Sequence, residues 1–190
     1  MKIAIIGDSL AAGTGDENDG GIAGRLPREM PSAETINLGV SGAVTADLMR
    51  RLKQANVRSA VQSADAIVLS IGANDLFRMP GVRDRALQNP LAVGNEILDR
   101  IRDAHIYLLG GYNPVPDHPL ASLIDIFLAQ WDEMLARRFD HDPRVSVLQT
   151  SDIVIGKNLS RYDRFHPGSP AYAAMARRIA EMIREVEAPA

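Results

Sequence analysis

The chain has 190 residues, 46% of them hydrophobic and 24% charged, with a formal net charge of −3 and no cysteine. This length favours one folding unit with a sizeable core, so we expect residues 1–190 to form a single domain. The absence of cysteine excludes disulfides, thiolate zinc sites and cysteine nucleophiles. Because no basic block is longer than an arginine pair, the charge pattern argues against nucleic acid as a partner.

The hydrophobic runs give no targeting or membrane signal. Residues 2–6 form an apolar run that is too short for the core of a signal peptide. No later run approaches the roughly 20 apolar residues of a membrane span. We therefore expect a cytoplasmic protein without stable membrane insertion.

The first part of the chain alternates short apolar runs with amphipathic stretches, a pattern typical of alternating strands and helices. Strands are predicted over 2–6, 35–38 and 64–71, each followed by a glycine, and helices over 22–30 and 44–52. A glycine-rich polar loop covers 11–21, between the first strand and the first helix.

The second part of the chain continues this alternation. Irregular loops are predicted over 76–90, 112–119 and 150–169, strands over 105–109 and 144–148, and helices over 91–102 and 120–135. The apolar residues of helix 120–135 recur with a helical period, and we expect them to belong to the core. A last helix is predicted to have Ser169 as its N-cap and Pro170 at its first helical position. The pattern as a whole predicts an α/β fold, a three-layer α/β/α sandwich around a five-stranded parallel, flavodoxin-like sheet.

Polar residues follow several predicted strands, at the edge of the sheet where parallel strands end together. Ser9 comes directly after the first strand, and Asp163 and His166 lie in the loop after the fifth. A nucleophilic serine needs a base, and the base needs an acceptor that orients it. A carboxylate three residues before a histidine can reach the Nδ1–H within a turn and leave Nε2 to face Ser9. These three residues therefore indicate nucleophilic acyl chemistry.

Other polar residues have structural interpretations. His105 is expected at the start of a strand, on the opposite edge of the sheet, and a solvated surface role is favoured for His118 and His141. Ser70 lies inside a predicted buried strand, and Asp8 is expected to cap the turn that follows it.

Acyl transfer also needs hydrogen-bond donors for the oxyanion, each worth roughly 10²- to 10³-fold in rate. The backbone N–H of Ser9 is one candidate donor. The N–H of Gly39 is a second, because a residue without Cβ lets a substrate approach closely, and the side-chain amide of Asn74 is a third. Taken alone, Asn74 or Asp75 also fits an ordinary Asx turn.

Four short blocks of the sequence resemble the SGNH/GDSL hydrolase family. They are Gly7-Asp8-Ser9-Leu10, Gly39 within Asn-Leu-Gly-Val-Ser-Gly, Gly72-Ala73-Asn74-Asp75 and Asp163-x-x-His166-Pro167, in the family's order over nearly the whole chain. The finer sequence is similar to bacterial lysophospholipase-like acylhydrolases. The resemblance implies the SGNH hydrolase fold, with Ser9 as nucleophile, His166 as base, Asp163 as its partner, and an oxyanion hole of Ser9, Gly39 and Asn74.

The function implied by this resemblance is that of a serine esterase or acylhydrolase acting on a small-molecule acyl ester. Short-chain acyl esters or lysophospholipids are the expected substrates, and no metal or organic cofactor is expected. A carbohydrate acetyl esterase or a thioesterase would use the same catalytic residues. We expect the partly apolar loops to shape the acyl or alcohol pocket through Leu76, Phe77, Met79, Tyr112 and Val115.

Two other classes of protein share parts of the pattern. An α/β-hydrolase proper requires Gly-x-Ser-x-Gly, and Ala11 stands in the place of the final glycine. A flavodoxin-like nucleotide- or flavin-binding module would have the same architecture without needing His166. However, the loop after the first strand lacks the Gly-Lys-Ser/Thr of a P-loop and the glycine spacing of a dinucleotide fingerprint.

Overall fold

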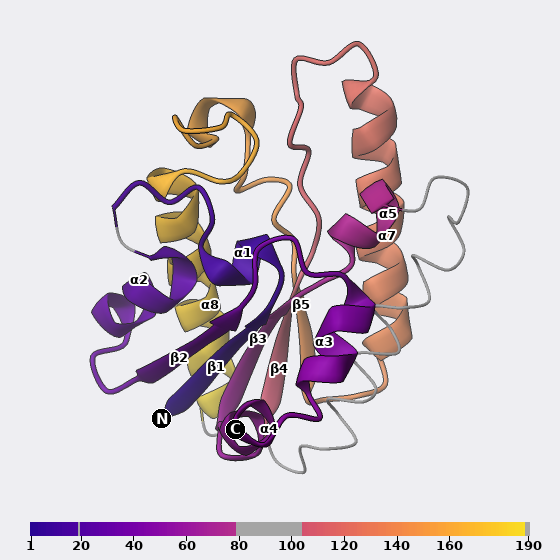
Figure 1. Cartoon of the computed structure of the whole chain (residues 1–190). Helices are drawn as coiled ribbons and strands as arrows, with labels where there is room; N and C mark the ends of the chain where they lie inside the picture. The colour runs from indigo at the N-terminus through magenta and orange to yellow at the C-terminus, as the bar shows by residue number, and fades with distance from the viewer. Residues whose placement is uncertain (19, 79–103, 189–190) are drawn as a thin grey trace.

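Five parallel strands form one sheet in the computed structural model, which describes residues 1–18, 20–78 and 104–188 and, for 76–78, only the backbone. The strands are β1 (Lys2–Gly7), β2 (Glu34–Gly39), β3 (Ala66–Ser70), β4 (His105–Leu109) and β5 (Val145–Leu148). Their order is β2-β1-β3-β4-β5, and every neighbouring pair is parallel (Figure 1). This is the flavodoxin-like order, so the predicted sheet is confirmed.

Helices cover both faces of the sheet and complete an α/β/α sandwich (Figure 1). They are α1 (Ser9–Ala12), α2 (Gly21–Glu29), α3 (Thr45–Arg51), α4 (Ala55–Gln62), α5 (Ala73–Arg78), α7 (Ala121–Phe139) and α8 (Ser169–Glu187), with a 3₁₀ turn, η1, at Gly156–Asn158. None of the helices in the described part of the chain is both long and apolar enough to cross a membrane.

Two short helices differ from the expectation drawn from the sequence. The pattern predicts one helix over 44–52, whereas the structure has α3 there and then α4, which buries only Val57 and Val61. Two buried residues make too short a stripe to indicate a helix. The predicted loop 76–90 begins with the last turn of α5. The rest of that loop and the predicted helix 91–102 lie outside the described residues.

Strand β1 shows how the core is divided between the two faces of the sheet. Ile3 and Ile5 pack in a hydrophobic cluster with α2 and α8, whereas Ala4 and Ile6 pack in a second cluster with α3, α4 and α7. Successive side chains alternate between the faces of a strand, and all four are fully buried. A strand covered on both faces therefore appears in the sequence as an unbroken apolar run.

The beginning of α8 corrects the prediction that Ser169 is its N-cap. Ser169 is the first helical residue, and the N-cap is Gly168. The Oγ of Ser169 donates to Oδ1 of Asp16 at 2.7 Å, and its N–H donates to Oε2 of Glu17 at 2.7 Å. This serine therefore binds the loop after α1 instead of capping its own helix.

Candidate active site

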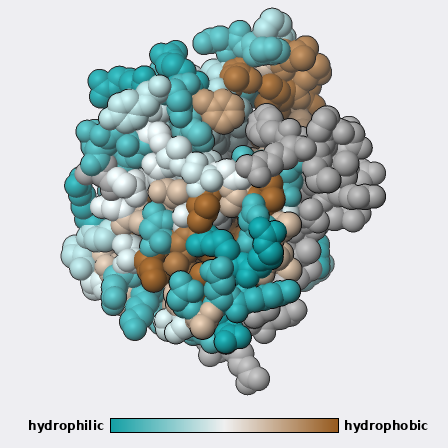
Figure 2. Space-filling view, in the orientation of Figure 1, coloured by the Kyte–Doolittle hydropathy of each residue, from teal (hydrophilic) through white to brown (hydrophobic). Residues whose placement is uncertain are grey.

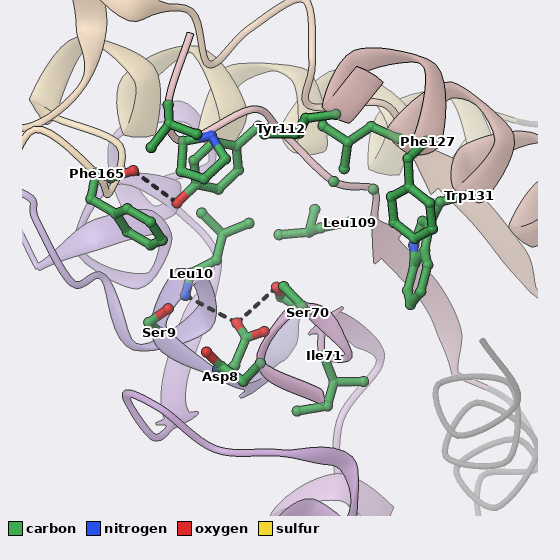
Figure 3. A pocket seen from close by; sticks show the side chains of 18 of the residues that line it. Asp8, Ser9, Leu10, Ser70, Ile71, Leu109, Tyr112, Phe127, Trp131 and Phe165 are labelled. Carbon is green, nitrogen blue, oxygen red and sulfur yellow. Dashed lines mark hydrogen bonds between the residues drawn. The ribbon is translucent and has the colours of Figure 1, made fainter. Parts of the chain in front are cut away.

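Ser9 lies just past the carboxyl end of β1, as the first residue of α1. The strand ends at Gly7 (φ +136°), where an added Cβ would lie 1.7 Å from the carbonyl oxygen of Ser70, so only glycine fits between β1 and β3. Asp8 then caps α1, because its Oδ1 accepts the N–H of Leu10 at 3.1 Å (Figure 3). The Gly-Asp-Ser sequence thus determines the turn that carries Ser9.

Asp8 supports this turn from below the surface. Its carboxyl also accepts a hydrogen bond from Oγ of Ser70 at 2.9 Å and is 3% exposed. Burial raises the pKa of Asp8 to about 6, against the lowering effect of the Ser70 hydroxyl. These contacts confirm the structural roles expected for Asp8 and Ser70.

Asp163 and His166 form a hydrogen-bonded pair in the loop between η1 and α8. Nδ1 of His166 lies 2.6 Å from Oδ2 of Asp163, and Oδ1 accepts the backbone N–H groups of Phe165 and His166 at 2.9 Å each. Burial alone would raise the pKa of Asp163, but the hydrogen bonds from His166 and Phe165 lower it. An ionised carboxylate only accepts, so Nδ1 carries the proton of the neutral ring and Nε2 is its basic atom. The spacing of the two residues predicts this orientation.

The loop of His166 and the turn of Ser9 open on the same cavity. Ser9 and Phe165, the residue before His166, both line it. Oη of Tyr112 donates to the carbonyl oxygen of Phe165 at 3.3 Å (Figure 3), and burial raises the pKa of this tyrosine. The Phe165 ring meets the His166 imidazole edge-on, with centroids 5.2 Å apart. Residues from the two ends of the chain thus lie around one pocket.

The other three histidines differ from His166 in their positions and partners. His105 begins β4 at the opposite edge of the sheet, as predicted, and its Nε2 lies 2.8 Å from Oγ of Ser146. His141 is exposed. His118 is also exposed, but it lines the cavity, and its Nδ1 accepts the N–H of Leu120 at 3.1 Å. Across the described ranges, no three His, Asp or Glu side chains gather as ligands of a metal ion would.

Asn74 is the second residue of α5 and lines the same cavity as Ser9. Its Nδ2 donates to the carbonyl oxygen of Ala43 at 3.0 Å, which orients the amide. Because an amide nitrogen carries two hydrogens, the second can serve another acceptor. The neighbouring Asp75 is buried and accepts hydrogen bonds from the N–H and Oγ1 of Thr45, so it joins α5 to α3.

Gly39, the other predicted oxyanion donor, has a partner of its own in the structure. Its N–H donates to Oδ1 of Asn37 at 2.9 Å. A Cβ added at Gly39 would lie 2.1 Å from the backbone nitrogen of Ala12, so the close packing of β2 against α1 requires glycine. To reach a substrate, the N–H of Gly39 would have to leave Asn37.

A second glycine of the same loop, Gly42, is a further candidate that the sequence analysis does not single out. It has a φ of +76°, a conformation that favours glycine. It directly precedes Ala43, whose carbonyl oxygen accepts the hydrogen bond from Asn74. The available signal is the pair of glycines in Gly39-x-x-Gly42, either of which can bring a backbone N–H close to a ligand.

The cavity beside Ser9 has a volume of about 640 Å³ and a mostly apolar lining. Its apolar side chains include Leu109, Tyr112, Pro114 and Val115 on the segment from the end of β4, and Leu120, Leu123, Ile124, Phe127, Leu128 and Trp131 on and just before α7 (Figure 3). Tyr112 and Val115 thus lie where a pocket is predicted. The side chains of Leu76 and Phe77, and all of Met79, lie outside the described residues.

The wall formed by α7 corrects the expectation that this helix contributes only to the core. Trp131 and Leu135 are buried, but Leu120, Leu123 and Ile126 are 54%, 61% and 56% exposed. Figure 2 shows the resulting apolar patch, in brown, over the start of α7. The signal available in the sequence is that apolar residues occupy more than one face of this helix, whereas a core contact needs one stripe.

Comparisons with known proteins identify the family of this chain. The model of the GDSL-like lipase/acylhydrolase family matches residues 5–187, and the chain belongs to this family. The Bacillus subtilis (strain 168) protein YpmR is 25% identical over 216 residues, which cover 100% of this chain and 84% of that protein. The predicted family is thereby confirmed.

Solved structures show the same fold. The lipase Lip_vut3 from a goat rumen metagenome has a TM-score of 0.78 at 24% identity, covering 98% of this chain and 97% of its own. A carbohydrate esterase family 2 enzyme with its carbohydrate-binding domain, from Corynascus thermopiles (Myceliophthora fergusii), has a TM-score of 0.74 at 17% identity, covering 98% of this chain and 66% of its own. These structures show the fold, and the family supports hydrolysis of ester bonds in general.

Proposed function

We propose that this protein is a serine esterase or acylhydrolase that cleaves carboxylic esters through an acyl-enzyme. The observation that carries the proposal is the Asp163–His166 pair, in a loop that shares its cavity with Ser9. Oγ of Ser9 attacks the ester carbonyl while Nε2 of His166 takes its proton and then gives it to the leaving alcohol. Water activated by the same histidine releases the acid. Asp163 keeps the proton on Nδ1 and stabilises the imidazolium.

The oxyanion of the tetrahedral intermediate needs donors close to Ser9. We assign the backbone N–H of Ser9 and the second amide hydrogen of Asn74 to this role, because Ala43 already orients that amide. The N–H of Gly39 is the predicted third donor, and it can serve the oxyanion once its hydrogen bond to Oδ1 of Asn37 breaks. Gly42 is the alternative donor from the same loop.

The lining of the cavity favours substrates with an extended acyl chain. A volume of about 640 Å³ lies within the usual range for small-ligand sites. Each methylene group buried against an apolar wall contributes about 0.8 kcal/mol. Sugar hydroxyls, in contrast, lose free energy in such a wall unless they find polar partners. We therefore favour acyl esters of the lysophospholipid type over acetylated sugars.

A carbohydrate acetyl esterase is the second candidate, because one structure with this fold is a carbohydrate esterase. A thioesterase would use the same serine and histidine. Hydrolysis of a panel of esters from acetyl to palmitoyl, with a lysophospholipid, an acyl thioester and an acetylated xylooligosaccharide, separates the three. Highest kcat/KM on the acetylated sugar would reject the acyl-chain assignment.

A flavodoxin-like binding module is the non-enzyme alternative, since the strand order is the same. Such a module would bind flavin mononucleotide or a nucleotide and would not turn over esters. A thermal shift with these ligands, measured beside turnover of a p-nitrophenyl ester, separates the two classes.

The decisive test replaces the two proposed catalytic side chains. We expect Ser9→Ala and His166→Ala each to lower kcat by at least roughly 10³-fold while the melting temperature stays near that of the wild type. Ser41→Ala is the matched control, because Ser41 is an exposed serine in the loop after β2. Full activity in Ser9→Ala or in His166→Ala would overturn the mechanism.

A further inference from the structure

The loop between α1 and α2 binds the segment that carries His166 on both sides of that residue. Oε1 of Glu17 accepts the backbone N–H of Arg161 at 2.8 Å, and Oε2 accepts the backbone N–H of Ser169 at 2.7 Å. The Glu17 side chain is only 7% exposed. The N–H of Arg161, together with that of Ser169, lowers the pKa of Glu17 to about 2, so the group is ionised at neutral pH.

Gly15 brings the same loop into direct contact with the histidine. A Cβ added at Gly15 would lie 2.6 Å from Cβ of His166 and 2.8 Å from the carbonyl oxygen of Pro167. Its φ of +91° also favours glycine. The loop after α1 therefore packs against Cβ of His166 and the backbone of Pro167 with no room for a side chain between them.

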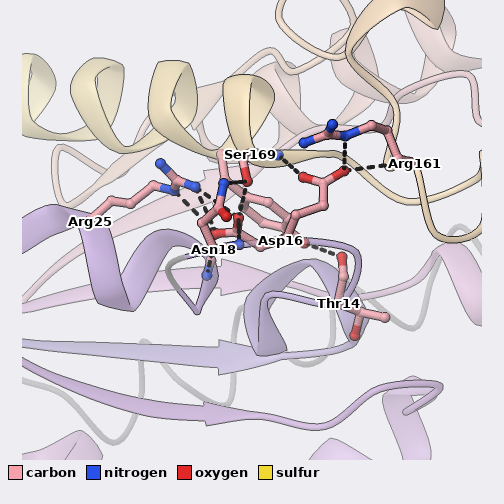
Figure 4. A network of polar contacts seen from close by, with 9 residues as sticks. Thr14, Asp16, Asn18, Arg25, Arg161 and Ser169 are labelled. Atoms are coloured by element: carbon pink, nitrogen blue, oxygen red, sulfur yellow. Dashed lines mark hydrogen bonds and ion pairs between the residues drawn. The ribbon is translucent and has the colours of Figure 1, made fainter.

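Asp16 anchors this loop to the rest of the fold (Figure 4). It forms an ion pair with Arg25 of α2 at 2.8 Å, in which the two side chains are 0% and 10% exposed. It also accepts the N–H of Gly21 at 2.8 Å and the Oγ of Ser169 at 2.7 Å. Burial alone would raise the pKa of Asp16, but the Arg25 guanidinium and the Ser169 hydroxyl lower it. The loop is thereby fixed to α2 and α8 together.

The turn that contains His166 needs such support. Arg164, between Asp163 and His166, has a φ of +55°, in the left-handed region that residues other than glycine rarely adopt. Backbone conformations of this kind persist where the surrounding structure determines them. The contacts of Glu17 at Arg161 and Ser169 are part of that surrounding structure.

We propose that Glu17 is a positioning residue for His166. Its carboxylate holds both ends of the segment 161–169 against the loop that starts at the end of α1, and so sets the direction of His166 relative to Ser9. The inference rests on the proposed roles of Ser9 and His166. Because a displacement of about 1 Å in a reacting group can cost 10²-fold in rate, this contact acts on catalysis through geometry.

The test is Glu17→Gln, which keeps the length of the side chain but loses the charge and one acceptor. We expect kcat for a p-nitrophenyl ester to fall on the order of 10²-fold, because His166 is displaced from Ser9. We expect KM to stay within about two-fold, because the pocket walls are unchanged. Asp65→Asn is the matched control: Oδ2 of Asp65 accepts the N–H of Lys2 at 2.6 Å, at the opposite edge of the sheet. We expect it to leave kcat unchanged.

A combined variant distinguishes positioning from a general loss of structure. If Glu17 acts through His166, adding Glu17→Gln to His166→Ala leaves the residual hydrolysis unchanged. Loosening of the whole site would lower it further.

Wild-type kcat in Glu17→Gln, an equal loss in Asp65→Asn, or a further loss in the combined variant would each overturn the positioning role. Ser9→Ala reports on the proposed function separately. If Ser9→Ala retains activity, the proposed function fails; if it is inactive while Glu17→Gln keeps its kcat, only the positioning role fails.

Discussion

The carboxyl groups on the two sides of Ser9, toward α8 and toward α7, have pKa values shifted in opposite directions. On the side of α8, Asp16, Glu17 and Asp163 each accept several hydrogen bonds from charged or backbone donors, and the pKa of each carboxyl is lowered. On the side of α7, Asp8 beside the cavity and Asp132 of the helix itself also accept hydrogen bonds, but burial outweighs them and raises the pKa of both. The balance between the depth of burial and the hydrogen bonds that a carboxyl accepts decides the direction of the shift.

This difference matches what each side has to do. The α8 side holds a histidine in one orientation, which requires directional contacts between fixed partners. The α7 side lines much of a cavity of about 640 Å³ with apolar side chains, which a flexible acyl chain can occupy in many ways. We infer that the polar side determines the rate of the reaction and the apolar side determines the choice of substrate.

The largest expected effect comes from the polar side. In Asp163→Asn the amide oxygen keeps the backbone N–H groups of Phe165 and His166, so the amide NH2 faces Nδ1 of His166 and donates to it. The ring then carries its proton on Nε2, the wrong tautomer for a base, and kcat should fall roughly 10⁴-fold. Steady-state kinetics measure this loss, with Asp142→Asn as control, since Asp142 binds Arg144 at the far edge of the sheet. Near wild-type kcat in Asp163→Asn would show that Asp163 does not orient the base.

The next largest effect is on the pH dependence of stability and comes from Asp8, whose pKa is raised by burial. The carboxyl has a pKa of about 6 in the folded protein and 3.8 ordinarily. The stabilisation that the protonated Asp8 gives the folded state is therefore complete below pH 3.8 and is lost as the pH rises through about 6. In Asp8→Asn the side-chain oxygen can still accept the hydrogen bonds from Leu10 and Ser70, and the amide carries no charge at any pH. As the pH rises from 3.8 to 6, the free energy of unfolding of the variant should therefore increase relative to the wild type, by up to about 3 kcal/mol.

Urea unfolding of both proteins at pH 4, 5, 6 and 7 measures this gain. A difference that does not change with pH would contradict the raised pKa of Asp8. Glu17 has the opposite pH dependence, because its pKa is lowered. The stabilisation that its carboxylate gives the folded state is complete above pH 4.5 and is lost as the pH falls toward 2.

The smallest expected effect comes from the apolar side. Ile124 lines the cavity and is half-buried, so Ile124→Trp should fill part of the acyl pocket. Losing the burial of two methylene groups corresponds to about a 10-fold lower kcat/KM for octanoyl and longer esters, with acetyl esters spared. Ile126→Trp is the control, because Ile126 is 56% exposed on the same helix. An unchanged chain-length profile in Ile124→Trp would remove α7 from the acyl pocket.

The sequence by itself determined the order of the elements and the main motif, because each depends on residues close together in the chain. A strand buried on both faces is an apolar run wherever it occurs, and β1 and β4 follow that pattern. The contact between Asp163 and His166 is also local, so a spacing of three residues was enough to predict it.

Only the tertiary structure decided the contacts between distant parts of the chain. The close approach of Gly39 to Ala12, the binding of Ser169 to Asp16 and Glu17, and the pocket wall on α7 all depend on how separate elements pack. Ser169 before Pro170 looks like a helix cap in the sequence, and its hydrogen-bond partners are elsewhere because a loop near the N-terminus folds against it. A local pattern states which groups can form hydrogen bonds, and the packed fold selects the partners.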